Sequence, residues 1–80
     1  MKIPRDLSGR ELVRALCKHW DYRVVNQVGS HVILQTETPG HQRISVPDHS
    51  PLRVGTLNAI LRQVAEHKGA TREDILDTLG

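Results

Sequence analysis

The five histidines of this sequence are its best candidates for proton chemistry, and the position of His31 sets it apart. It directly follows Gly29 and Ser30, a turn signal, and it begins an apolar stretch that is typical of a strand. An imidazole can take up or release a proton near neutral pH, and the 2′-hydroxyl of RNA is a natural target for such a group. If Val32 and Leu34 face the core, alternation along the strand predicts that His31 points outward. The opposite register would bury it.

Other reactive patterns are weak or missing. The histidines lack the paired spacing of a zinc site, since they are scattered at His19, His31, His41, His49 and His67. The sequence has neither a glycine-rich phosphate loop followed by Lys and Ser or Thr nor a G-x-G-x-x-G run. Cys17 falls on the apolar stripe of an expected helix, which is typical of a small core residue. We therefore expect no metal ion and no nucleotide cofactor.

The composition describes one small folded domain. The chain has 80 residues, of which 38% are hydrophobic and 25% charged, and its net charge of +2 is compatible with a polyanionic partner without requiring one. Trp20 and Tyr22 are its only aromatic residues, which argues against an aromatic platform that stacks bases. The sequence has one cysteine, no export signal and no apolar run near the roughly 20 residues that a membrane helix needs. We therefore expect a cytosolic protein.

Three helices are predicted from capping residues and apolar spacing. Ser8 and Glu11 form a capping box, so the first helix should begin at Ser8 or Gly9 and end near His19 or Trp20. A second helix is expected over residues 53–67, with Gly69 as a left-handed cap. Thr71 then looks like the N-cap of a short third helix that extends to residue 79.

Three strands are predicted between the first two helices. Residues 22–28 and 31–36 are rich in β-branched side chains and flank Gly29-Ser30, so they should form an antiparallel hairpin. Residues 42–46 alternate, with Ile44 and Val46 on one face. We expect an α+β fold of the order α-β-β-β-α, in which a three-stranded antiparallel sheet carries both long helices on one face. This is also the architecture of double-stranded-RNA-binding domains.

Several short motifs in this order resemble those of one protein family. The run Gly29-Ser30-His31 resembles the G-S-H signature of HicA-type, or YcfA-like, toxins. Val46-Pro47 and the later run G-T-L-N-A-I-L, which begins at Gly55, resemble the segment that joins the third strand of that family to its second helix. Trp20 stands at the place of a family tryptophan. The resemblance covers residues 8–67, so we expect a single HicA-like domain over residues 1–80 with a core at 8–67 and an appended short helix at 71–79.

The resemblance implies a metal-independent mRNA interferase, an endoribonuclease that is the toxin of a type II toxin–antitoxin pair. Its catalytic residue would be His31, its substrate mRNA, and its partner a HicB-type antitoxin that covers the active site. The sequence departs from the family pattern at Val28, where many members have Lys or Arg, and at Ile33 and Leu34, where many have an aromatic residue nearby. These departures bear on how the substrate is held.

Further substrate contacts are proposed around His31. Arg43 on the third strand could bind phosphate or be an ordinary solvated strand residue. Ser30 and Gly29 could position a phosphate or serve only the turn. Lys18, with Arg23 and Arg53, could contact the RNA backbone or only increase solubility.

Two other functions remain open from the sequence. The same fold could bind RNA without cutting it, in which case replacing His31 would be tolerated. It could also be a protein-interaction domain whose open sheet face serves a partner, and the weak basic balance favours this over a pure RNA binder.

Overall fold

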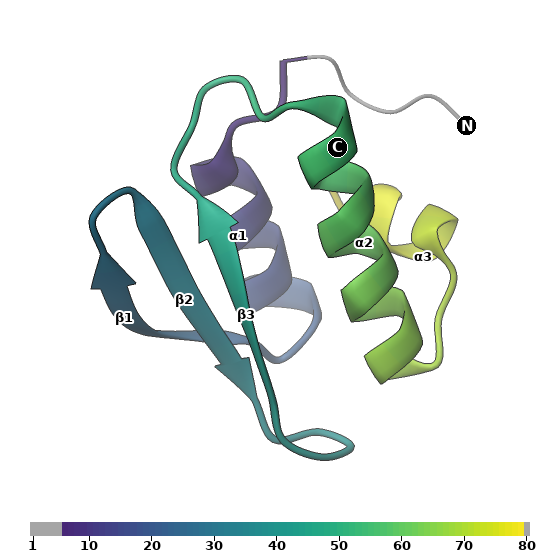
Figure 1. The fold of residues 1–80 in the computed structure, drawn as a ribbon. Helices are drawn as coiled ribbons and strands as arrows, with labels where there is room; N and C mark the ends of the chain where they lie inside the picture. Colours follow the sequence, from purple (N-terminus) through teal and green to yellow (C-terminus); the bar gives the residue numbers. More distant parts are fainter. Residues whose placement is uncertain (1–5, 80) are drawn as a thin grey trace.

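The computed structural model describes residues 6–79, and its elements follow the predicted order (Figure 1). Residues 1–5, on which the expected absence of an export signal partly depends, lie outside this range. The elements are α1 (Gly9–His19), β1 (Arg23–Val28), β2 (His31–Thr36), β3 (Gln42–Pro47), α2 (Val54–Lys68) and α3 (Arg72–Leu76). The strands form one antiparallel sheet in the order β1-β2-β3, and α1 and α2 pack against it. The predicted α+β fold is confirmed.

The ends of α1 are fixed by short local interactions. The Ser8 hydroxyl accepts a hydrogen bond from the Glu11 backbone at 3.1 Å, and the Glu11 carboxylate accepts one from the Ser8 backbone at 3.3 Å. This is the predicted capping box. At the other end Asp21 takes a positive φ of 60°, and the Tyr22 backbone donates to the Leu16 carbonyl at 3.3 Å. Tyr22, expected in the first strand, is therefore part of the helix exit, and its ring is buried.

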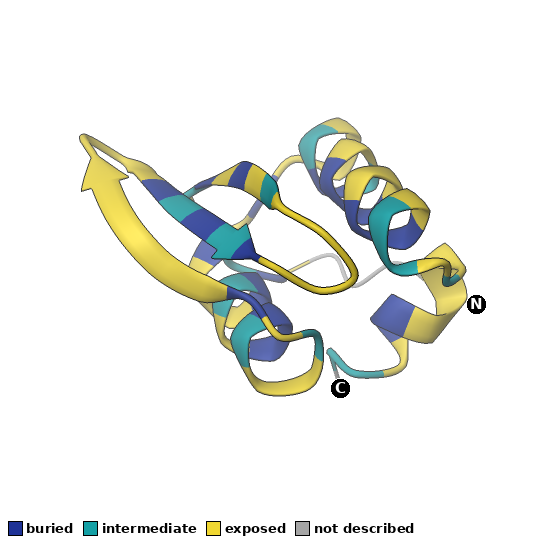
Figure 2. Ribbon diagram, turned by 90° about the horizontal axis from the view of Figure 1, so that it is seen from below, coloured by how far each residue is buried: buried dark blue, intermediate teal, exposed yellow. Residues whose placement is uncertain are grey.

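The sheet has one buried and one open face. Alternate residues of β2 are buried, beginning with Val32 and Leu34, and on β3 the buried pair is Ile44 and Val46. Together with apolar residues of α1, α2 and α3 they form one core. β1 differs because all of its residues are exposed, as the unbroken yellow of that strand in Figure 2 shows. The open face and the free edge of β1 are thus the surfaces that the helices leave uncovered.

The second helix matches the prediction to within one residue at each end, whereas the third is shorter than predicted. α2 ends at the predicted left-handed Gly69, with φ of 66°, and Thr71 forms a capping box with Asp74. α3 stops at Leu76 rather than at residue 79, because the next backbone groups bond three residues back, from Thr78 to Ile75 and from Leu79 to Leu76. Within residues 6–79, no helix is both long and apolar enough to cross a membrane.

Candidate functional site

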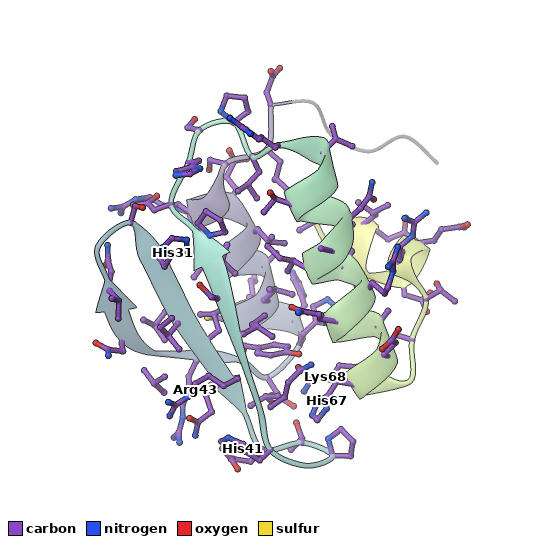
Figure 3. The ribbon with its side chains drawn as sticks, in the orientation of Figure 1. His31, His41, Arg43, His67 and Lys68 are labelled. Carbon is purple, nitrogen blue, oxygen red and sulfur yellow. The ribbon has the colours of Figure 1, made fainter. Side chains whose placement is uncertain are left out.

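His31 is the first residue of β2, and its side chain lies exposed on the open face of the sheet (Figure 3). Its neighbour Val32 is buried, so the register in which His31 points outward is the one adopted. Val28 on β1 and Pro47 on β3 are its cross-strand partners. Of the two orientations that the sequence left open for His31, the structure adopts the outward one, while its role in catalysis stays a prediction.

The turn that precedes His31 depends on glycine. Val28 and His31 pair directly, so Gly29 and Ser30 are the two central residues of a tight hairpin. Gly29 has φ of 59°, and a positive φ at the first central position is the arrangement of a type II′ turn, which favours glycine. A Cβ atom on Gly29 would meet no other atom within 4 Å, so its backbone angle, and not crowding, explains the residue.

A second set of contacts holds the hairpin tip from the other side. The Ser30 carbonyl accepts a hydrogen bond from the Asp48 backbone at 2.6 Å, and the His49 carbonyl accepts one from the Gly9 backbone at 2.8 Å. The Asp48 carboxylate forms an ion pair with Arg10 of α1 at 3.3 Å. The backbone around His31 is thus tied to the start of α1 through the loop that follows β3.

Asp48 was not recognised from the sequence as part of this site. A Pro-Asp pair at the end of a strand is a local turn signal, and it could have marked residue 48 as a residue that ends β3. Its pairing with Arg10 could not have been found in this way, because it depends on how α1 packs against the sheet.

The imidazole of His31 is free for chemistry. Within residues 6–79 it makes no hydrogen bond and no ion pair, and the Asp48 carboxylate is directed to Arg10 instead. Its immediate cross-strand neighbours, Val28 and Pro47, are not titratable. The site therefore offers one accessible acid–base group on a rigid strand, in an open and shallow setting.

Arg43 shares the open face with His31 but lies near its other end, as Figure 3 shows. It pairs with Gln35, four residues after His31, and at about 3.3 Å per residue this separates the two positions by about 13 Å. Its guanidinium donates to the Gln35 side chain at 2.8 and 3.2 Å. The structure therefore does not place Arg43 beside the imidazole.

The polar network around Arg43 continues along the strand end. Gln35 donates to the Glu37 carboxylate at 2.7 Å, and His41 lies 3.1 Å from that carboxylate. These hydrogen bonds, first from Gln35 and then from His41, lower the pKa of the Glu37 carboxyl. The network orients the Arg43 side chain before any ligand arrives.

The remaining predicted residues divide between two places. Gly29 and Ser30 lie next to His31 at the hairpin tip. Lys18 lies on the last turn of α1, where it lines a hollow with Glu11, Arg14 and the C-terminal residues Thr78 and Leu79. That hollow belongs to the helical layer, so the structure does not bring Lys18 to the face that carries His31.

Two other histidines, His41 and His67, have hydrogen-bond partners. His67 lies 2.7 Å from the Gly40 carbonyl and holds the β2–β3 loop against the end of α2. Across residues 6–79, no three His, Cys, Asp or Glu side chains gather in a way that could hold a metal ion.

Comparison with known proteins agrees with the fold and with the motifs. A family model described as "HicA toxin of bacterial toxin-antitoxin" matches residues 9–65, from the first residue of α1 to the last turns of α2. No curated protein and no solved structure matches the chain. Since the family match covers well over half of the sequence, this chain belongs to the HicA toxin family and is a toxin of a toxin–antitoxin system.

Proposed function

We propose that the protein is an endoribonuclease that cleaves mRNA through acid–base chemistry of His31, without a metal ion. One observation carries the proposal. The histidine of the G-S-H motif is exposed on the open face of the sheet and has no hydrogen-bond partner among residues 6–79, and its backbone is held by α1 and the loop after β3. A flat open face suits an extended RNA strand better than it suits a small molecule, which needs an enclosing pocket.

The chemistry requires one proton acceptor next to a 2′-hydroxyl. An imidazole nitrogen of His31 takes the proton of the 2′-hydroxyl, and the oxygen then attacks the adjacent phosphorus. The bond from phosphorus to the 5′-oxygen breaks, and that oxygen takes a proton from water. The products are a 2′,3′-cyclic phosphate and a 5′-hydroxyl end, and His31 returns its proton to the solvent. If His31 instead acts as the general acid on the 5′-oxygen, water accepts the first proton.

The neighbouring groups hold the RNA. Ser30, the residue before His31, would bind the phosphate next to the scissile bond. Arg43, already oriented by Gln35, would bind a phosphate further along the strand, since it lies about 13 Å away by the rise of β2. Binding through such charges should weaken as salt is added.

A toxin of this family has an antitoxin partner. We propose that the partner is of the HicB type and that it blocks cleavage by covering the open face around His31. Among residues 6–79 the His31 side chain is exposed, so we expect control of the activity to come from a partner that covers it.

Induced expression tests the proposal. The chain and its His31→Ala variant are expressed at matched levels, and growth and total RNA are followed. His19→Ala is the matched control, because His19 is also exposed but lies on the last turn of α1, in the helical layer. We expect growth arrest and mRNA loss with the unaltered chain and the control, but not with His31→Ala.

The purified proteins complete the test. Incubation with a labelled RNA in the presence of EDTA should yield 2′,3′-cyclic phosphate ends only when His31 is intact. If folded His31→Ala still cuts RNA, His31 is not the catalytic residue. If no form cuts RNA but all bind it in a salt-sensitive way, the domain is an RNA-binding module.

A further inference from the structure

A groove separates α1 from the edge strand β1 on the side of the sheet that faces the helices. Its volume is about 300 Å³. Three valines provide its apolar surface, and longer polar side chains stand around it. The lining residues are Arg10, Val13, Arg14, Val24, Gln27 and Val32.

The strand beside this groove exposes apolar side chains on both of its faces. Val24 pairs with Leu34 and so points to the groove side, where it remains 52% exposed. Val28 pairs with His31 and points to the open face, where it is 61% exposed. Clustered exposed apolar residues on a small protein mark a surface that meets a partner. Exposed apolar side chains of β1 therefore lie both beside the groove, at Val24, and beside His31, at Val28.

The charge of the groove is positive. Arg10 and Arg14 stand one helical turn apart on α1, and none of the residues that line the groove is acidic. Arg10 reaches Asp48 but its side chain is 75% exposed, and within the described range 6–79 Arg14 forms no ion pair. An occupant that complements this groove carries acidic groups next to apolar side chains.

Two other occupants fit less well. A second copy related by a two-fold axis would bring the arginines of both copies together, which is unfavourable. RNA would place its phosphates over Val13, Val24 and Val32, which offer no hydrogen bonds. An acidic protein segment satisfies both the apolar floor and the cationic rim.

The partner should dock through side chains rather than by adding a strand. The Gln27 backbone N–H, which points to the free edge, is already bonded to the Asn26 side chain at 2.8 Å. A bulge between Val24 and Asn26 also interrupts the edge. Such features protect an edge from further strand pairing. The mode of docking that fits this surface is an amphipathic segment that lays its apolar face in the groove.

We propose that the antitoxin docks in this α1–β1 groove with an acidic, amphipathic segment and continues around the edge of β1 to His31. This deepens the proposed function, on which it rests for the partner, by naming a contact surface on the far side of the strand from the imidazole. An antitoxin that contacts both sides of β1 binds more tightly because of the groove, and it inhibits the toxin by covering His31 on the open face.

Binding of the purified cognate antitoxin to the full chain tests this. Arg14→Glu should weaken the affinity at least tenfold at low salt, and Val24→Ser should weaken it through the apolar floor. Arg62→Glu on the exposed side of α2 makes the same change in net charge and should leave the affinity within about twofold. Circular dichroism establishes that each variant is folded.

Each other outcome overturns the proposal. If Arg14→Glu and Val24→Ser bind the antitoxin as tightly as the unaltered chain does, the antitoxin binds elsewhere. If Arg62→Glu loses as much affinity as Arg14→Glu, the loss reflects only the change in net charge. If Arg14→Glu instead lowers RNA affinity, the groove binds RNA. The RNA assay of the free toxin is separate: we expect Arg14→Glu to cut RNA as the unaltered chain does. If no form cuts RNA, the proposed activity fails while the comparison of antitoxin affinities still stands.

Discussion

The backbone of Gly9 lies so close to the carbonyl oxygen of Pro47 that a Cβ atom on Gly9 would come within 1.9 Å of it. Pro47 is the residue of β3 that pairs with His31. The first residue of α1 therefore packs directly against the strand end that positions the candidate catalytic histidine. Because both sides of the contact are backbone, neither can move without moving its element.

The first prediction concerns this contact. Gly9→Ala should lower the free energy of unfolding by about 1–3 kcal/mol, since the added methyl group forces α1 away from β3. Urea unfolding followed by the fluorescence of the single tryptophan, Trp20, measures the change. Gly55→Ala is the control: it lies in α2 with open space around its Cβ position, so it should be neutral or stabilising by up to about 1 kcal/mol. Equal effects of the two variants would contradict the contact.

A second prediction tests whether the turn at Gly29 positions His31 in addition to stabilising the fold. Gly29→Ala puts a side chain on a residue with φ of 59°, which should cost about 1–2 kcal/mol. The strain lies next to His31, so RNA cleavage by the folded fraction should fall as well. Gly40→Ala, in another loop and with open space around it, should change neither stability nor cleavage. Full cleavage by folded Gly29→Ala would show that the geometry of the turn does not position the histidine.

The elements could be predicted from the sequence because their signals are local. Ser8 with Glu11, Thr71 with Asp74 and the left-handed Gly69 all act within one or two helical turns, and each proved to end or begin a helix at the expected residue. The prediction was wrong at Tyr22. Tyrosine favours strands, but here its backbone bonds to Leu16 at the end of α1 and its ring is buried in the core. Tertiary burial there overrides the local preference.

The candidate site could be predicted only where its residues belong to one strand or one helix. Alternation along a single strand left two registers open for His31, and the structure adopts the one in which Val32 is buried and His31 points outward. The separation of Arg43 from His31 depends on the pairing of β2 with β3, and the place of Lys18 depends on the packing of the C-terminal segment against α1. The pair of Arg10 and Asp48 joins two elements that are distant in sequence. No single-strand or single-helix pattern contains such information.

A third prediction concerns the far end of the sheet, where Lys68 of α2 binds the β2–β3 loop. Its ammonium group donates to the Thr36 hydroxyl at 2.9 Å, to the Thr38 carbonyl at 2.6 Å and to the Thr38 hydroxyl at 3.1 Å. Lys68→Met should destabilise the protein by about 1–3 kcal/mol, because it leaves the buried Thr36 oxygen without its charged donor.

A double-mutant cycle isolates that interaction. Thr36→Val removes the acceptor, so Lys68→Met should cost less in the Thr36→Val background than in the unaltered chain, by roughly 0.5–3 kcal/mol. Urea unfolding of the four proteins gives the coupling. Strict additivity of the two changes would mean that Lys68 acts on the loop through Thr38 alone.

The last prediction concerns Tyr22, the only tyrosine of the chain. Burial raises the pKa of its phenol from 10.0 to about 12. The folded protein therefore keeps this proton between pH 10 and pH 12, where the unfolded chain releases it, so stability is fully present below pH 10 and falls as the pH rises towards 12. Two pKa units correspond to about 2–3 kcal/mol.

Absorbance of the phenolate measures this pKa directly, because no other residue contributes tyrosinate absorption. The folded protein should titrate near pH 12 and the urea-unfolded chain near pH 10. Tyr22→Phe loses the hydrogen bond to Gln42 at every pH, but its stability should decline less between pH 10 and pH 12 than that of the unaltered chain. Comparing the two slopes removes the contribution of every group that both proteins share. A midpoint near pH 10 in the folded state would show that water reaches the phenol and that the ring is not part of the closed core.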